Sequence, residues 1–141
     1  MATVIRAEVS TKNKYWIPKH RHYELKHFCL QYPVWKKEYA RLDCSKITSP
    51  LSLLDYISST NTPSDPTGKC VLIRDYYGSK IQLIEKAAME ADEYLYEYIM
   101  KAVTEGLPYT YLQTVMDIPC SRDTYYDRYR KFFWLLSKMR G

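Results

Sequence analysis

The C-terminal stretch 108–141 reads PYTYLQTVMDIPCSRDTYYDRYRKFFWLLSKMRG, and it decides the fold. Its apolar spacing predicts a short helix over 109–116. A tight connection follows over 117–120. Ser121 is a favoured N-cap residue, so a second helix is expected to begin directly after it. The stretch therefore predicts two helices joined by a turn.

The two helices have complementary apolar sides. Leu112, Val115 and Met116 are expected on one side of the first helix, and Ile118 can plug the turn. The second helix carries an inward stripe at helical spacing, made of Tyr125, Tyr129, Phe132 and Leu136. A short helix, a turn and an amphipathic second helix are the parts of a DNA-binding helix-turn-helix, here about 109–138.

Polar side chains on the second helix are the candidate DNA contacts. Arg122 suits a bidentate contact with guanine, and Asp123 either accepts from cytosine or favours the positive helix end. Tyr126 lies one turn on and can meet a base or a phosphate. The remaining candidates suit phosphate contacts and are Ser121, Thr124, Arg128, Arg130 and Lys131. A helical hairpin that only packs within the protein remains the alternative.

The rest of the chain also predicts helices and no strand, so the expected fold is a small all-α protein with a C-terminal helix-turn-helix. Three segments are expected: a basic helical unit over 1–43, a Ser/Thr/Pro-rich linker over 44–68, and a helical unit over 69–141. Within the first, Pro18 opens a helix, and a second helix runs over about 34–43.

Further local signals concern the third segment. Asp92 is expected to cap a helix whose buried face contains Leu95, Ile99, Ala102 and Val103. Gly106 and Pro108 are expected to end that helix. Gly78 lies inside the preceding helical pattern, where it costs about 1 kcal/mol relative to alanine.

Charge is distributed unevenly along the 141 residues. The formal net charge is +5, with balances of +6 over 1–42, −4 over 43–108 and +3 over 109–141. Two basic ends therefore flank an acidic middle, and one or both ends suit a phosphate partner. The aspartates at 123 and 127 favour a selective reader of DNA over a sequence-blind binder.

Several other classes of protein lack support in the sequence. No secretory signal and no apolar run of about 20 residues occurs, so we expect no membrane partner and a cytoplasmic location with free thiols. The four cysteines match no zinc motif. A metal site formed by nearby histidines and Cys29 is a minor alternative to a basic helix face. No catalytic motif occurs, so we expect no enzyme and no cofactor.

The chain resembles the phage transcriptional regulators of the RinA and ArpU type over roughly residues 14–138. The segments that carry this resemblance are KYWIPKHRHYELKHFCLQYPVWKKEY (14–39), NTPSDPTGK (61–69), KIQLIEKA (80–87) and IPCSRDTYYDRYRKFFWLL (118–136). The last segment is also similar to region 4 of sigma factors. The resemblance implies an activator of late phage genes in a bacterial host cell.

The sequence differs from that family pattern by its bulky C-terminal aromatics, which are Tyr125, Tyr126, Phe132, Phe133 and Trp134. They suggest packing against the N-terminal unit or a second subunit. Double-stranded DNA, RNA polymerase and a second copy of the chain are the expected partners. Two alternatives stay open: a DNA-packaging recognition subunit like a small terminase, and a protein-interaction module that binds host polymerase or a repressor.

Overall fold

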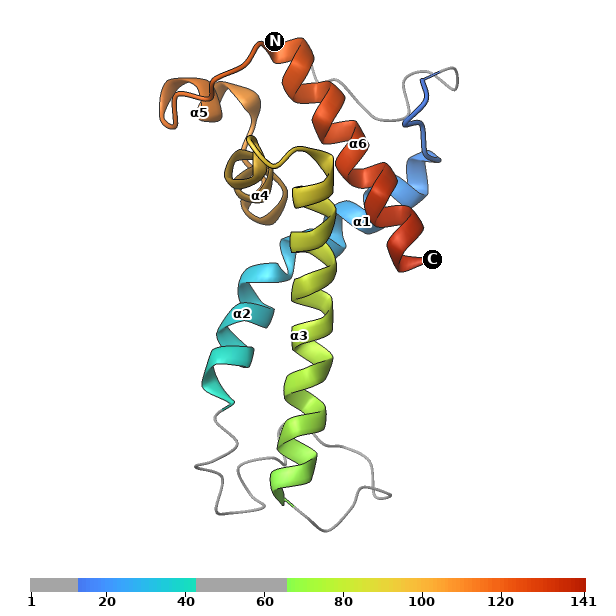
Figure 1. The fold of residues 1–141 in the computed structure, drawn as a ribbon, viewed down its shortest axis with the longest axis vertical. Coiled ribbons are helices and arrows are strands. Elements are labelled where there is room, and N and C mark those ends of the chain that lie inside the picture. The colour runs from blue at the N-terminus through green and yellow to red at the C-terminus, as the bar shows by residue number, and fades with distance from the viewer. Residues whose placement is uncertain (1–12, 43–65) are drawn as a thin grey trace. The chain divides into compact units, whose positions relative to one another are not determined.

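The computed structural model describes residues 13–42 and 66–141, and the regular elements in these ranges are helices (Figure 1). They are α1 Lys19–Leu30, α2 Tyr32–Arg41, α3 Pro66–Ala91, α4 Tyr96–Glu105, α5 Tyr109–Thr114 and α6 Arg122–Arg140. The predicted all-α class is therefore confirmed for the described part of the chain. Residues 1–12 and 43–65, which include most of the predicted linker over 44–68, lie outside the described residues.

Proline positions set several of the helix starts. Pro18 directly precedes α1, as predicted. Pro33 lies in the first turn of α2, where its missing N–H group costs no helical hydrogen bond. Consequently α2 starts at Tyr32, two residues before the expected boundary. Since α3 begins at Pro66, the prediction that 66–68 belong to the linker is wrong.

Helix α4 ends as its sequence predicts, but it starts differently. Gly106 is left-handed with φ 70°, and the Leu107 N–H donates to the Ala102 carbonyl at 3.2 Å. At the other end Leu95, and not Asp92, occupies the N-cap position. The Asp92 carboxylate instead accepts from the backbone N–H groups of Tyr94 (2.9 Å) and Leu95 (3.2 Å). Asp92 therefore orders the turn before α4.

The described residues form two compact units. One contains 13–33 together with 82–141, and the other contains 34–42 together with 66–81. This division differs from the predicted segments, because α1 groups with the C-terminal helices.

The larger unit has a continuous apolar core. In it α1 packs against α4 and α6, and α4 packs against α5. The predicted buried face of α4 is confirmed at Leu95, Ile99, Ala102 and Val103. The largest fully buried side chains of this unit are Tyr125, Phe132, Phe133, Leu25, Ile84, Ile99, Leu112 and Leu136. The core therefore draws on helices from both ends of the chain.

In the smaller unit, aromatic rings of α2 face basic residues of α3. The Arg74 guanidinium lies 3.9 Å from the centre of the Tyr39 ring, and Lys80 Nζ lies 5.4 Å from that of Trp35. A Cβ atom at Gly78 would lie 3.0 Å from Tyr39 Cε2. Gly78 therefore lets the Tyr39 ring approach α3 closely. This contact explains why the position holds glycine, although glycine weakens a helix.

The cysteines differ from expectation at one position. Cys70 is fully buried and disulfide-bonded, so the prediction of free thiols is wrong there. Cys29 and Cys120 are free, and burial raises the pKa of both thiols. Among the described helices, none has the length and apolar character needed to cross a bilayer. The cytoplasmic location stays a prediction.

Candidate nucleic-acid interface

Helix α5 is shorter than its apolar pattern suggested. It ends at Thr114 instead of the expected residue 116. Leu112 is fully buried, whereas the side chain of Val115 is 61% exposed, so the prediction that Val115 packs inward is wrong. Ile118 is buried, which confirms the predicted apolar plug of the turn.

The turn between α5 and α6 runs from Val115 to Ser121 and is longer than the three or four residues that are usual in a helix-turn-helix. Asp117 adopts a left-handed conformation with φ 54°. Aspartate tolerates this backbone better than most non-glycine residues do. The Ile118 N–H then donates to the Leu112 carbonyl at 3.0 Å, which closes the turn onto α5.

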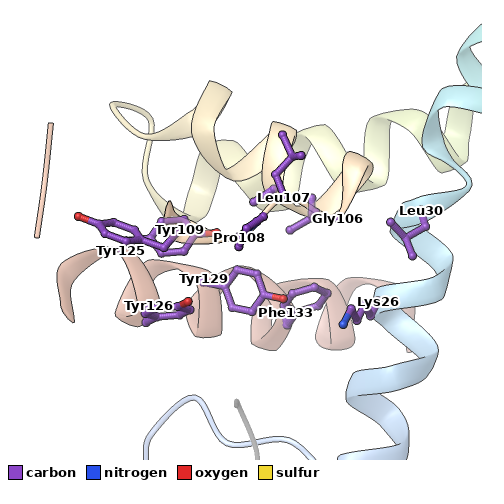
Figure 2. Close-up of a pocket in the computed structure, with 12 residues that line it drawn as sticks. Lys26, Leu30, Gly106, Leu107, Pro108, Tyr109, Tyr125, Tyr126, Tyr129 and Phe133 are labelled. Carbon is purple, nitrogen blue, oxygen red and sulfur yellow. The ribbon is translucent and has the colours of Figure 1, made fainter. Parts of the chain in front are cut away.

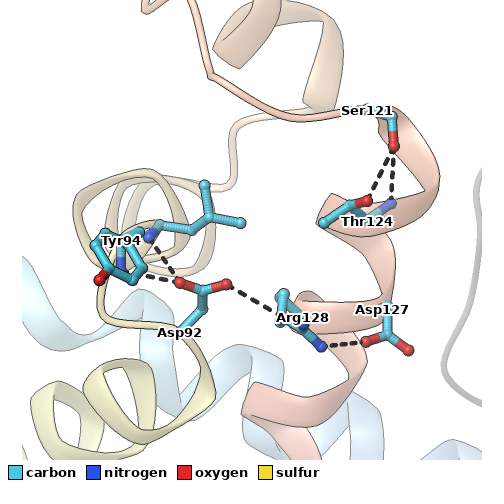
Figure 3. A network of polar contacts seen from close by, with 7 residues as sticks. Asp92, Tyr94, Ser121, Thr124, Asp127 and Arg128 are labelled. Carbon is cyan, nitrogen blue, oxygen red and sulfur yellow. Dashed lines mark hydrogen bonds and ion pairs between the residues drawn. The ribbon is translucent and has the colours of Figure 1, made fainter.

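Ser121 caps α6, as the sequence predicts. Its Oγ atom accepts from the Thr124 N–H at 3.3 Å and donates to Thr124 Oγ1 at 3.0 Å (Figure 3). The cap satisfies a backbone donor that would otherwise lack a partner within the helix. The two hydroxyls predicted to contact phosphates are therefore bonded to each other, so Ser121 Oγ would have to redirect its proton to donate to a phosphate.

The cap gives a direct test of local stability. We expect Ser121→Ala to lower the free energy of unfolding by about 1 kcal/mol, because the Thr124 N–H loses its acceptor. Ser121→Asp restores an acceptor and should recover most of that loss. Urea denaturation followed by circular dichroism measures both variants. Equal stability of the alanine and aspartate variants would contradict the role of the cap.

The first turn of α6 is open to solvent. Ser121, Arg122, Asp123 and Thr124 are all exposed. The Arg122 guanidinium lies 5.5 Å from the centre of the Tyr109 ring on α5, close enough for a cation–π interaction. Asp123 lies at the positive end of the helix, where a carboxylate is favourable. Arg122 thus has an orienting neighbour while it stays accessible.

The other predicted contacts, Tyr126, Arg128, Arg130 and Lys131, are half-buried. Tyr126 belongs to a group of tyrosine rings, 5.0 Å from Tyr125 and 6.3 Å from Tyr109 between ring centres. The prediction that Tyr126 faces outward is therefore wrong, because its ring packs against those of Tyr125 and Tyr109. Its ring is a wall of the cavity between α6 and the end of α4 (Figure 2).

Arg128 is engaged within the protein. Its Nε lies 3.2 Å from Asp92 Oδ2, and its Nη1 lies 2.6 Å from Asp127 Oδ2 (Figure 3). The first of these ion pairs ties α6 to the turn between α3 and α4. A phosphate could recruit Arg128 only in competition with two carboxylates, so the predicted phosphate contact is the weakest of the set.

No protein-family model, curated protein or solved structure was found to match this chain.

The C-terminal aromatics pack against residues from the start of the chain. Trp134 meets Tyr15 edge-on at 5.4 Å between ring centres, and Phe133 meets His22 of α1 at 4.9 Å. For Phe133 and Trp134, these contacts confirm the first of the two predicted alternatives, packing against the N-terminal part. Residues that precede α1 or belong to it therefore pack against the C-terminal half of α6.

Histidines and Cys29 do not assemble a metal site. Within the described ranges, no group of three or more histidine, cysteine, aspartate or glutamate side chains could hold a metal ion. His22 is buried against the rings of Phe133 and Tyr129, and Cys29 is fully buried in the core. His22 and Cys29 are therefore part of the protein interior.

Proposed function

We propose that this chain is a sequence-specific DNA-binding regulator of transcription, with the first turn of α6 as the part that reads DNA. The observation that carries the proposal is the Ser121-capped, solvent-exposed start of this 19-residue helix, which follows a short packed helix. In helix-turn-helix proteins, base contacts come from the N-terminal residues of the second helix. The resemblance to phage late-gene activators supports the regulatory part.

The charges near this turn support a selective contact. Arg122 and Lys131 form no ion pair with another described residue. Both cations can therefore bind DNA without the loss of an existing ion pair. Arg122 reaches out from the first turn, where a bidentate contact with guanine is possible. Asp123 beside it repels phosphates and suits a base amino group. We therefore assign base reading to Arg122 and Asp123, and phosphate binding to Lys131.

Two substitutions separate these roles. We expect Arg122→Ala to cost about 1–3 kcal/mol on the preferred duplex and to reduce discrimination between duplexes. Lys131→Ala should weaken binding to all duplexes alike and lower the slope of log affinity against log salt concentration by about 1. Fluorescence anisotropy on a labelled duplex, selected from source-genome fragments, measures both quantities.

Lys101→Ala provides the matched control. Lys101 is half-exposed on α4, where it pairs with Glu105 at 2.8 Å, so its loss removes the same charge away from α6. This variant should bind the selected duplex nearly as the unaltered protein does. If Lys101→Ala weakened binding as much as Lys131→Ala, the basic charge alone would explain it and α6 would not be the interface.

The selection experiment also separates the alternatives. Enrichment of an operator by a monomer or dimer would support a transcriptional regulator. Enrichment of DNA next to a packaging gene, by an assembly with the mass of a ring, would instead favour a packaging recognition subunit. No enrichment of any fragment would refute DNA reading and favour a protein-interaction module.

A further inference from the structure

A cavity of about 200 Å³ lies between α1, the end of α4, the start of α5 and α6 (Figure 2). All of its walls belong to the larger unit of the chain. Gly106 and Leu107 form the edge where α4 turns into α5. The side chains that determine its chemistry are Lys26, Tyr109, Tyr125, Tyr126, Tyr129 and Phe133.

Five of the twelve residues that line the cavity are aromatic, and several of their rings meet at an angle. Tyr126 stands edge-on to Tyr125 at 5.0 Å between ring centres, and Tyr129 stands edge-on to Phe133 at 5.0 Å. Tyr125 and Phe133 are fully buried behind the partly exposed rings of Tyr126 and Tyr129. A further aromatic ring packs favourably against the face or the edge of an exposed ring. The walls therefore suit a planar aromatic group better than a flexible aliphatic chain.

Lys26 adds a positive charge at the side of the cavity formed by α1. Its side chain extends from α1 towards Phe133 (Figure 2). Within the described part of the chain it forms no ion pair, and it is exposed. An ammonium group beside aromatic walls favours an anionic substituent on the bound ring. The Tyr126 hydroxyl makes no hydrogen bond to another described residue, so it can donate to the same substituent.

The volume limits the size of the ligand. An apolar cavity of about 150 Å³ is known to hold one benzene molecule, whereas drug-sized ligands need about 300 Å³ or more. A cavity of about 200 Å³ therefore holds one ring and a small substituent, and it is too small for a nucleotide. We infer that this cavity binds a small aromatic carboxylate, with the ring among the tyrosines and the carboxylate at Lys26.

Calorimetric titration with benzoate and benzamide tests this inference. The two ligands have nearly the same shape, but only benzoate is charged. We expect the unaltered protein to bind benzoate with a Kd of about 1 mM and benzamide at least fivefold more weakly. Lys26→Gln should weaken benzoate about tenfold, which is 1.4 kcal/mol, and leave benzamide unchanged. Lys19→Gln, an exposed lysine of α1 that does not line the cavity, should change neither.

Chemical shifts of the backbone amides locate the site. Benzoate should move the signals of Gly106, Leu107 and Tyr126 and leave those of Tyr94 and Val115 in place.

N-acetylphenylalanine serves as a second probe, because tighter binding of this compound would identify a C-terminal aromatic residue of a peptide as the source of the carboxylate. Equal benzoate affinity of Lys26→Gln and the unaltered protein, or no binding at about 10 mM, would overturn the inference. DNA is absent from these measurements, so their outcome is separate from that of the proposed function.

Discussion

Phe133→Ala should lower the free energy of unfolding by about 3–5 kcal/mol, because it removes a buried ring at the junction of α1 and α6. The Phe133 side chain is fully buried. Its ring lies 4.9 Å from the centres of both His22 and Phe132, in edge-to-face arrangements. Truncation therefore loses apolar burial and these aromatic contacts together. Urea denaturation monitored by circular dichroism gives the change.

Two further variants serve as controls for the loss of stability in Phe133→Ala. Phe133→Leu retains most of the buried volume and should cost less than half as much. Val115→Ala removes an exposed apolar side chain and should change stability by less than about 0.5 kcal/mol. A domain of this size is typically stable by about 5–15 kcal/mol, so Phe133→Ala is measured at reduced temperature if it is largely unfolded. A loss no larger than that of Phe133→Leu would contradict the packing of α1 on α6.

Asp92→Ala should lower the free energy of unfolding by about 2–4 kcal/mol, the second largest effect that we expect. The carboxylate accepts two backbone N–H groups with Oδ1 and pairs with Arg128 through Oδ2 (Figure 3). Its side chain is 18% exposed, so water replaces these bonds only in part. The alanine variant therefore leaves backbone donors and a guanidinium poorly satisfied.

The asparagine variant separates the two roles of this carboxylate. Asp92→Asn keeps an acceptor for the backbone N–H groups of the turn but loses the charge opposite Arg128. We expect it to lose only about 1 kcal/mol. Combining it with Arg128→Met should add little further loss, which a double-mutant cycle measures. Glu90→Ala, an exposed carboxylate on α3, is the control and should be nearly neutral. Additive losses from Asp92→Asn and Arg128→Met would contradict the ion pair.

Local sequence signals predicted most helix positions well. Pro18 before α1, Gly106 after α4 and Ser121 before α6 act through the backbone of their own turn, so their effect is readable from a few neighbouring residues. The same signals failed at the end of α5. There the left-handed Asp117 and the bond from Ile118 to Leu112 end the helix early, although the apolar spacing continues.

Contacts between distant residues were harder to anticipate. From the sequence, Arg128 was predicted to contact a phosphate. No residue near it in the chain indicates that Asp92 lies opposite its guanidinium. The sequence also marked Tyr126 as outward-facing, since a helical stripe predicts one buried side, whereas α6 meets neighbours on more than one side. The disulfide at Cys70 was missed for a similar reason, because cysteine spacing alone does not determine pairing.

The sequence by itself determined that the described part of the chain is helical, where α1, α5 and α6 begin and where α4 ends, and that α6 opens on a serine cap followed by Arg122. Periodicity and capping act over one or two turns, so they need no knowledge of the fold. Only the tertiary structure decided which cations of α6 are already paired and which are accessible. It alone brought Lys26 of α1 to the tyrosines of α5 and α6, because such neighbours arise from helix packing between residues about a hundred positions apart.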